Sequence, residues 1–69
     1  MSIADNMRHI RKQRGYSQEK IAEILNTTQQ QYSKYENGVN EIPVHHVITL
    51  CKFYSISSDW LLGLKKTEE

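Results

Sequence analysis

Residues that end helices recur at short intervals along this chain, and they limit each possible helix to a few turns. Glycine and asparagine can adopt the left-handed backbone that follows the last turn of a helix. Such residues stand after segments in which apolar side chains have helical spacing: Gly15, Asn26, Gly38 and Gly63. No segment alternates apolar and polar residues, which is the pattern of a half-buried strand. The sequence therefore predicts an all-α protein made of five short helices.

The starts of the predicted helices carry residues that suit a helix N-terminus. Serine and threonine side chains accept a hydrogen bond from the first free N–H groups, and proline is tolerated in the first turn. The candidates are Ser17, Thr27 or Thr28, Pro43 in the first turn of the fourth helix, and Ser57 or Ser58. Apolar residues then follow at helical spacing: Ile3, Met7 and Ile10; Ile21, Ala22, Ile24 and Leu25; Val44, Val47, Leu50, Cys51 and Tyr54.

The size and composition of the chain allow one compact core. It has 69 residues, of which 38% are hydrophobic and 25% charged, so we expect residues 1–69 to form a single domain. The longest stretches without Asp, Glu, Lys or Arg, residues 24–33 and 42–51, are ten residues each, whereas a membrane-spanning helix needs about 20 apolar residues. The first twenty residues contain no secretory signal, and the single cysteine cannot form an internal disulfide. We therefore expect a cytoplasmic protein, and neither a membrane protein, a disulfide scaffold nor a multidomain enzyme.

Positive charge gathers near the start of the chain, although the net charge is only +1. Residues 8–20 hold five bases and one acid. Such a local field can face a polyanion such as nucleic acid. A solvated helix face would carry the same residues, so the charge pattern alone leaves both interpretations open.

The segment from Gln18 to Gly38 is the most informative part of the chain. It contains two helices that are too short to be stable alone, joined by a short turn, which is the pattern of a helix-turn-helix unit. At about 100° per residue, the third helix has Tyr32, Tyr35 and Thr28 on its inner side. Its outer side carries only polar side chains: Gln29, Gln30, Ser33, Lys34 and Asn37.

This outer side suits the major groove of DNA. A glutamine amide can pair with N6–H and N7 of adenine, and Lys34 can donate to guanine or to a phosphate. Gln29 and Gln30, in the first turn, would project furthest into the groove. Gln18 lies at the start of the preceding helix, where free N–H groups attract a phosphate. Solvent-facing helices also carry such residues, so an ordinary solvated face is the alternative.

Several motifs stand in order along the chain: IRKQRGYSQEKIA at residues 10–22, SKYENG at 33–38, Ile42-Pro43, and SSDWLLG at 57–63. In this order and spacing they resemble the Cro/C1-type, or XRE-type, helix-turn-helix regulators, which include the lambdoid phage repressors. The resemblance covers residues 8–63 and implies a compact five-helix, lambda-repressor-like DNA-binding domain with its helix-turn-helix at about 18–38. It also implies that the apolar stripes share one core. We expect residues 64–69 to be a flexible tail.

Carried over position by position, the resemblance implies which side chains meet DNA. The base edges would be contacted by Gln29, Gln30 and Lys34, with Ser33 beside them. The phosphates would be held by Gln18, Thr28 and Asn37, with Gln31 between the two roles.

The resemblance also implies an ion pair and shows two departures. Arg11 and Glu36 match a family pair that ties the first helix to the end of the third, whereas a loose surface pair is the alternative. Many relatives carry Lys or Arg just after Asn-Gly, where this chain has Val39, Asn40 and Glu41, so we expect modest affinity per monomer. We also expect no sensory domain after Gly63 and therefore no effector pocket.

No metal, cofactor or catalytic site is predicted. His45 and His46 are adjacent and would point about 100° apart on a helix, His9 is distant, and no cysteine stands at ligand spacing. Cys51 lies on an apolar stripe, so we expect a core residue rather than a reactive thiol. Phosphate loops, nucleophile motifs and paired acids are missing from the sequence, so we expect no enzyme activity.

The last predicted helix leaves two interpretations open. Either Trp60 caps the core, or Trp60, Leu61 and Leu64 form the seam of a two-fold dimer with its recognition helices about 34 Å apart. We favour a homodimer on DNA. The predicted function is that of a small transcriptional regulator, a repressor that binds double-stranded DNA at a pseudo-palindromic operator. The alternative is a protein-interaction module on the same fold, such as an antitoxin-like partner.

Overall fold

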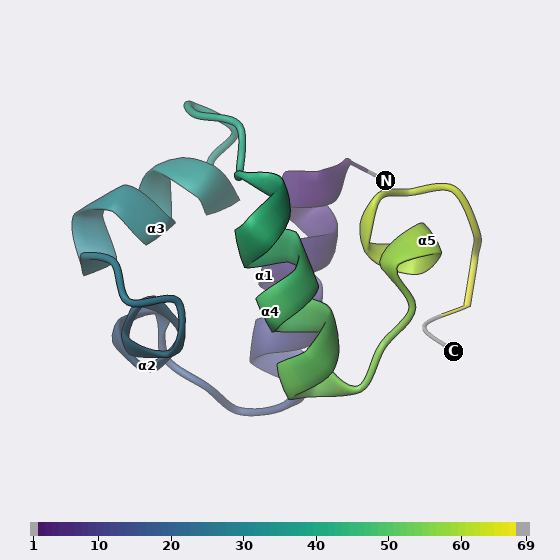
Figure 1. The fold of residues 1–69 in the computed structure, drawn as a ribbon, viewed down its shortest axis with the longest axis horizontal. Helices are drawn as coiled ribbons and strands as arrows, with labels where there is room; N and C mark the ends of the chain where they lie inside the picture. Colours follow the sequence, from purple (N-terminus) through teal and green to yellow (C-terminus); the bar gives the residue numbers. More distant parts are fainter. Residues whose placement is uncertain (1, 68–69) are drawn as a thin grey trace.

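The computed structural model describes residues 2–67 and contains five α-helices in this range. They are α1 (Ile3–Gln13), α2 (Gln18–Ile24), α3 (Gln29–Glu36), α4 (Val44–Tyr54) and α5 (Ser58–Leu61) (Figure 1). No strand occurs among residues 2–67. The prediction of an all-α fold with five helices is confirmed.

Serine and threonine hydroxyls start four of the helices. Each accepts a hydrogen bond of 3.0–3.1 Å from a backbone N–H two or three residues further on. The four caps are Ser2, Ser17, Thr28 and Ser57. The sequence leaves two alternatives open for two of these caps. Thr28, and not Thr27, caps α3, and Ser57, and not Ser58, caps α5.

Pro43 differs slightly from its predicted place. The sequence puts it in the first turn of the fourth helix, but it lies one residue before α4, with φ −61° and ψ 149°. The proline ring fixes φ and leaves ψ free to be extended, so the same residue fits either position.

The helices end where the sequence predicts. The four expected residues all have left-handed backbone, with φ of 77° at Gly15, 57° at Asn26, 73° at Gly38 and 83° at Gly63. Ser55 ends α4 in the same way, with φ 57°, although serine is not a residue that signals this conformation.

One hydrophobic cluster forms the core, and all five helices contribute to it. α3 packs against α1 and α2, while α5 packs against α1 and α4. Figure 1 shows α3 and α5 at opposite ends of the molecule, with α1 and α4 between them. Large side chains with almost no exposed surface include Met7, Ile10, Ile21, Tyr32, Leu50, Tyr54 and Leu61. This arrangement covers only one side of α3.

Five residues predicted on buried faces are not fully covered, and two of them, Ile3 and Cys51, are half-buried. Val44, the first residue of α4, is exposed. Ile24 is half-buried in the last turn of α2. Thr28 is exposed because its backbone is extended at the N-cap, so the helical rotation does not apply to it.

Trp60 and Leu61 belong to the core of the single chain, which favours the interpretation in which Trp60 caps the core. Trp60 is 6% exposed and Leu61 0%. The α1 residue Asn6 supports them, because its Nδ2 donates to the carbonyl oxygens of Trp60 at 3.0 Å and Leu61 at 3.3 Å. The apolar side chains that stay exposed at this end are Leu62 at 42% and Leu64 at 74%.

No helix within the described range is long and apolar enough to cross a membrane. Residues 2–67 bring together no group of three or more His, Cys, Asp or Glu that could hold a metal ion. Cys51 is half-buried, and burial raises the pKa of its thiol. Of the predicted tail, residues 64–67 are exposed, and residues 68–69 lie outside the described range.

Candidate nucleic-acid interface

The third helix has one aromatic and one polar side, as predicted. Tyr32 and Tyr35 are buried against the rest of the core. The other side carries the exposed side chains of Gln29, Gln30, Lys34 and Asn37, with Ser33 half-buried among them. The exposed side of α3 is therefore free to meet a partner.

Five of the predicted contact residues line a single shallow hollow on this side. They are Gln18, Gln29, Gln30, Ser33 and Lys34, and the hollow has a volume of about 420 Å³. We call it the α3 hollow. It combines four residues of α3 with the first residue of α2. The structure thus brings all four candidates for base contacts together with one candidate for a phosphate contact.

The other candidates for phosphate contacts lie outside this lining. The hydroxyl of Thr28 accepts a hydrogen bond from the backbone N–H of Gln31 at 3.1 Å. Asn37 is exposed at the end of α3, where its Nδ2 donates to Oγ of Ser33 at 3.3 Å. Gln31 itself is half-buried. These three residues therefore flank the α3 hollow without lining it.

Arg11 and Glu36 form a buried ion pair. Nε of Arg11 donates to Oε2 of Glu36 at 2.6 Å and its Nη2 donates to Oε1 at 3.1 Å. The side chains are 11% and 0% exposed, so the pair is the predicted tie between α1 and the end of α3 and not a loose surface pair. Burial alone would raise the pKa of the Glu36 carboxyl, but hydrogen bonding, to which Arg11 contributes most and Gln18 less, together with the charge of Arg11, outweighs burial and lowers it.

Two further side chains join this pair, and sequence reasoning did not assign them to it. Arg8 donates from Nη2 to the backbone carbonyl of Glu36 at 2.8 Å. Gln18 donates from Nε2 to Oε1 of Glu36 at 3.2 Å. The spacing of Arg8 and Arg11, three residues apart on one helix, is a signal that could have indicated the first contact. Nothing in the sequence indicates the second.

The local positive charge is weaker than the sequence suggests. Of the five bases in residues 8–20, Arg8 lies 3.9 Å from the carboxylate of Asp5 and Arg11 is paired with Glu36. Lys34 is the one charged residue in the lining of the α3 hollow. These contacts with carboxylates leave less positive charge for a polyanion, and modest affinity remains a prediction.

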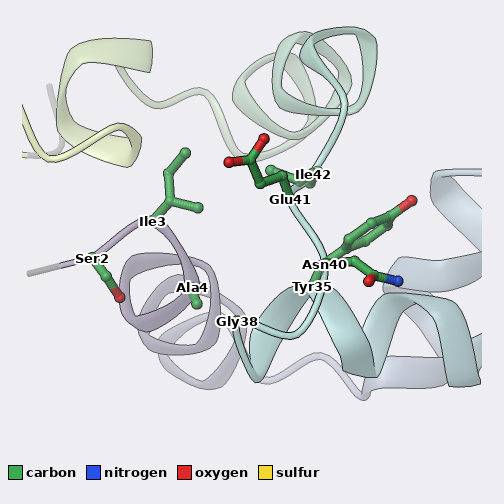
Figure 2. A pocket seen from close by; sticks show the side chains of 8 residues that line it. All are labelled: Ser2, Ile3, Ala4, Tyr35, Gly38, Asn40, Glu41 and Ile42. Carbon is green, nitrogen blue, oxygen red and sulfur yellow. The ribbon is translucent and has the colours of Figure 1, made fainter.

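A second hollow, of about 400 Å³, lies between the start of α1 and the segment that follows α3. Figure 2 shows the side chains that line it: Ser2, Ile3, Ala4, Tyr35, Gly38, Asn40, Glu41 and Ile42. Glu41 is the one charged residue in this lining. None of the predicted DNA contacts lines this second hollow, so it lies apart from the candidate interface.

Comparisons with known proteins agree with this geometry. The helix-turn-helix family model (HTH_3) matches residues 7–61. The chain is similar to the HTH-type transcriptional regulator ImmR of Bacillus subtilis (strain 168), with 32% identity over 63 residues, which are 91% of this chain and 50% of that protein. It is also similar to the SPbeta prophage-derived uncharacterized HTH-type transcriptional regulator YonR of the same strain, with 34% identity over 60 residues, 87% of this chain and 56% of that protein.

A solved structure has the same fold. It is that of a transcriptional regulator from Listeria innocua, with a TM-score of 0.85 and 27% identity, covering 90% of this chain and 58% of that chain. The chain spans about half the length of the curated relatives that it matches. The family match covers most of the chain, including every residue of the α3 hollow. The chain therefore belongs to the helix-turn-helix family of the Cro/C1, or XRE, type.

Proposed function

We propose that this protein binds double-stranded DNA sequence-specifically and regulates transcription, with α3 lying in the major groove. The observation that carries the proposal is the α3 hollow, which gathers three amide side chains, a hydroxyl and one ammonium on the uncovered side of α3. Such side chains offer donors and acceptors that match base edges. The relatives named as transcriptional regulators support the same function.

In this proposal, some side chains contact base edges and others contact phosphates. Gln29 and Gln30 lie in the first turn of α3, from which recognition helices make most base contacts, and each amide can pair with adenine. Lys34 donates to guanine O6 or N7, and Ser33 contacts bases beside it. Gln18, Thr28, Asn37 and Gln31 hold the flanking phosphates and so fix the position of α3 in the groove.

The protein acts as a repressor by occupying its operator as a homodimer. Two recognition helices about 34 Å apart would read the two halves of a pseudo-palindrome. Because Trp60 and Leu61 are buried in one chain, the seam is formed by Leu62 and Leu64, the exposed apolar side chains next to them. Such a two-fold contact uses the same surface on both copies.

Selection of bound duplexes from a random pool, at about 100 mM salt to suppress non-specific binding, tests this function. Enrichment of an inverted repeat with half-site centres about ten base pairs apart is the expected result. A folded protein that enriches no sequence would contradict it. That outcome would favour the protein-interaction alternative, for which Val44 and Ile48, exposed one turn apart on α4, offer an apolar contact.

A further inference from the structure

Glu36 connects the buried part of the fold to the α3 hollow through one carboxylate. Its Oε1 accepts hydrogen bonds from Nη2 of Arg11 at 3.1 Å and from Nε2 of Gln18 at 3.2 Å. Glu36 is 1% exposed, whereas Gln18 is half-buried and lines the hollow. The Gln18 side chain is therefore anchored at one end and presented to solvent at the other.

The chemistry of the carboxylate decides which end of the amide is anchored. An ionised carboxylate has acceptors and no donor. The hydrogen bonds that lower the pKa of Glu36 keep it ionised near neutral pH. Gln18 must therefore turn its NH₂ group toward Glu36, which leaves Oε1 and the second N–H of Gln18 for other partners.

Resting on the proposed function, we propose that Glu36 is a positioning residue for DNA recognition, because it fixes the orientation of the Gln18 amide before DNA arrives. Gln18 then offers DNA one N–H donor, suited to a phosphate oxygen, and one carbonyl acceptor, suited to a donor of a neighbouring side chain or base. A free glutamine side chain loses rotamer entropy when it is ordered. In this protein that ordering has already occurred before binding, which is the advantage of a preorganised contact.

The first test needs no DNA. In ¹⁵N-edited NMR spectra of the unaltered protein, the Gln18 side-chain N–H that faces Glu36 is expected to resonate downfield and to exchange slowly with water. The exposed amide of Gln30 is the internal reference and should exchange rapidly. Equal exchange and equal chemical shifts for the two amides would overturn the inference, whatever the protein binds.

The second test is a double-mutant cycle on the DNA sequence that the protein selects. Gln18→Ala removes one hydrogen bond, and Glu36→Gln replaces the charged acceptor of Gln18 by a neutral amide that no longer fixes which end of Gln18 faces it, so each should weaken binding about threefold to tenfold. If Glu36 acts through Gln18, the double variant should bind within about twofold of Gln18→Ala alone. Circular dichroism at the temperature of the binding measurement shows that each variant is folded.

A matched double-mutant cycle with Gln30 in place of Gln18 distinguishes an effect of Glu36 through Gln18 from a general effect of the Glu36 substitution on folding. Gln30 lines the same hollow, and no hydrogen bond joins it to Glu36 among the described residues. Glu36→Gln and Gln30→Ala should therefore have independent effects on binding. Additive losses in the Gln18 cycle, or equal coupling in both cycles, would overturn the inference. If the unaltered protein selects no DNA, the proposed function fails instead, and the NMR test still decides how Gln18 is held.

Discussion

The carboxylate of Glu36 has lost nearly all contact with water, and Arg11 supplies the charge that compensates for this loss. Removal of one partner from a buried pair leaves the other charge without compensation, which costs about 3–5 kcal/mol. We expect Arg11→Met to lower the free energy of unfolding by this amount in urea denaturation. Lys12→Met removes an exposed positive charge from the same helix and should change stability little. A loss below about 1 kcal/mol for Arg11→Met would be typical of a surface pair.

The same ion pair makes the free energy of unfolding depend on pH in the acidic range. The pKa of Glu36 is lower in the folded protein than its ordinary value of 4.5, so the unfolded chain binds the proton more readily. The stabilisation from Glu36 is therefore fully present above about pH 4.5 and is lost as pH falls below it toward the folded pKa. Urea denaturation at a series of pH values should show this loss, and Glu36→Gln should remove that part of the dependence. An unchanged acid slope in Glu36→Gln would show that groups other than Glu36 cause the loss of stability in acid.

Gln30 and Gln31 are neighbours with different places on α3, and this difference predicts different effects on binding. Gln30 is exposed in the α3 hollow, whereas Gln31 is half-buried outside it. We expect Gln30→Ala to cost about 1–3 kcal/mol on the selected sequence and little on random DNA. Gln31→Ala should weaken both to a similar extent, because phosphate contacts carry no sequence information. Fluorescence anisotropy measures the affinity of each variant for the selected and the random duplex. An equal loss of affinity for both duplexes in Gln30→Ala would exclude a base contact by Gln30.

At the scale of the helix, Thr28 caps α3 and is also proposed to contact a phosphate, and substitutions can separate these two roles. Its hydroxyl caps α3 by accepting from the N–H of Gln31 at 3.1 Å, and loss of such a cap costs about 1 kcal/mol. Thr28→Ala should therefore lower the melting temperature and also weaken DNA binding. Thr28→Asp keeps an acceptor for the cap but has no donor for a phosphate and adds negative charge. It should preserve the melting temperature and still weaken binding, whereas full binding by Thr28→Asp would exclude a phosphate contact.

The ends of the helices could be predicted from the sequence because the chemistry that fixes them is local. Ser17 caps α2 with a hydrogen bond to a residue three positions away, and Gly38 adopts its left-handed backbone without help from tertiary contacts. Ser55 has the same backbone, but serine does not favour it, so it could not be predicted. Burial depends on distant elements: Trp60 is covered in part because Asn6 fastens the end of α5 to α1.

The same distinction between local features and contacts of distant elements applies to the candidate site. The outer side of α3, with Gln30 and Lys34, follows from the 3.6-residue repeat of one helix. The contact between Gln18 and Glu36 joins residues 18 positions apart, so it could not be predicted from the periodicity of a single helix. The pair of Arg11 and Glu36, 25 positions apart, could be predicted only through resemblance to a family.

At the scale of the whole molecule, net charge matters less than where uncompensated bases lie. The net charge is +1, Arg11 is paired with Glu36, and the segment after α3 carries no base between residues 37 and 43. Each phosphate contact changes the slope of log affinity against log salt by about 0.9. The proposed interface should therefore show a shallow salt dependence for each monomer.

A lysine added to this segment provides a direct test of how the domain lies on DNA. Val39 is 68% exposed and follows Gly38 at the end of α3, where the family likeness implies that the chain meets the DNA backbone. We expect Val39→Lys to steepen the salt slope by about one unit and to raise affinity for selected and random duplexes alike, because the new contact reaches a phosphate. Binding titrations at several salt concentrations measure the slope. Ile48→Lys makes the same apolar-to-lysine change on α4, where the side chain is 50% exposed, and should leave the slope unchanged. If both variants steepened the slope equally, the added charge would be acting through the net charge of the protein, and the segment after α3 would not be lying against DNA.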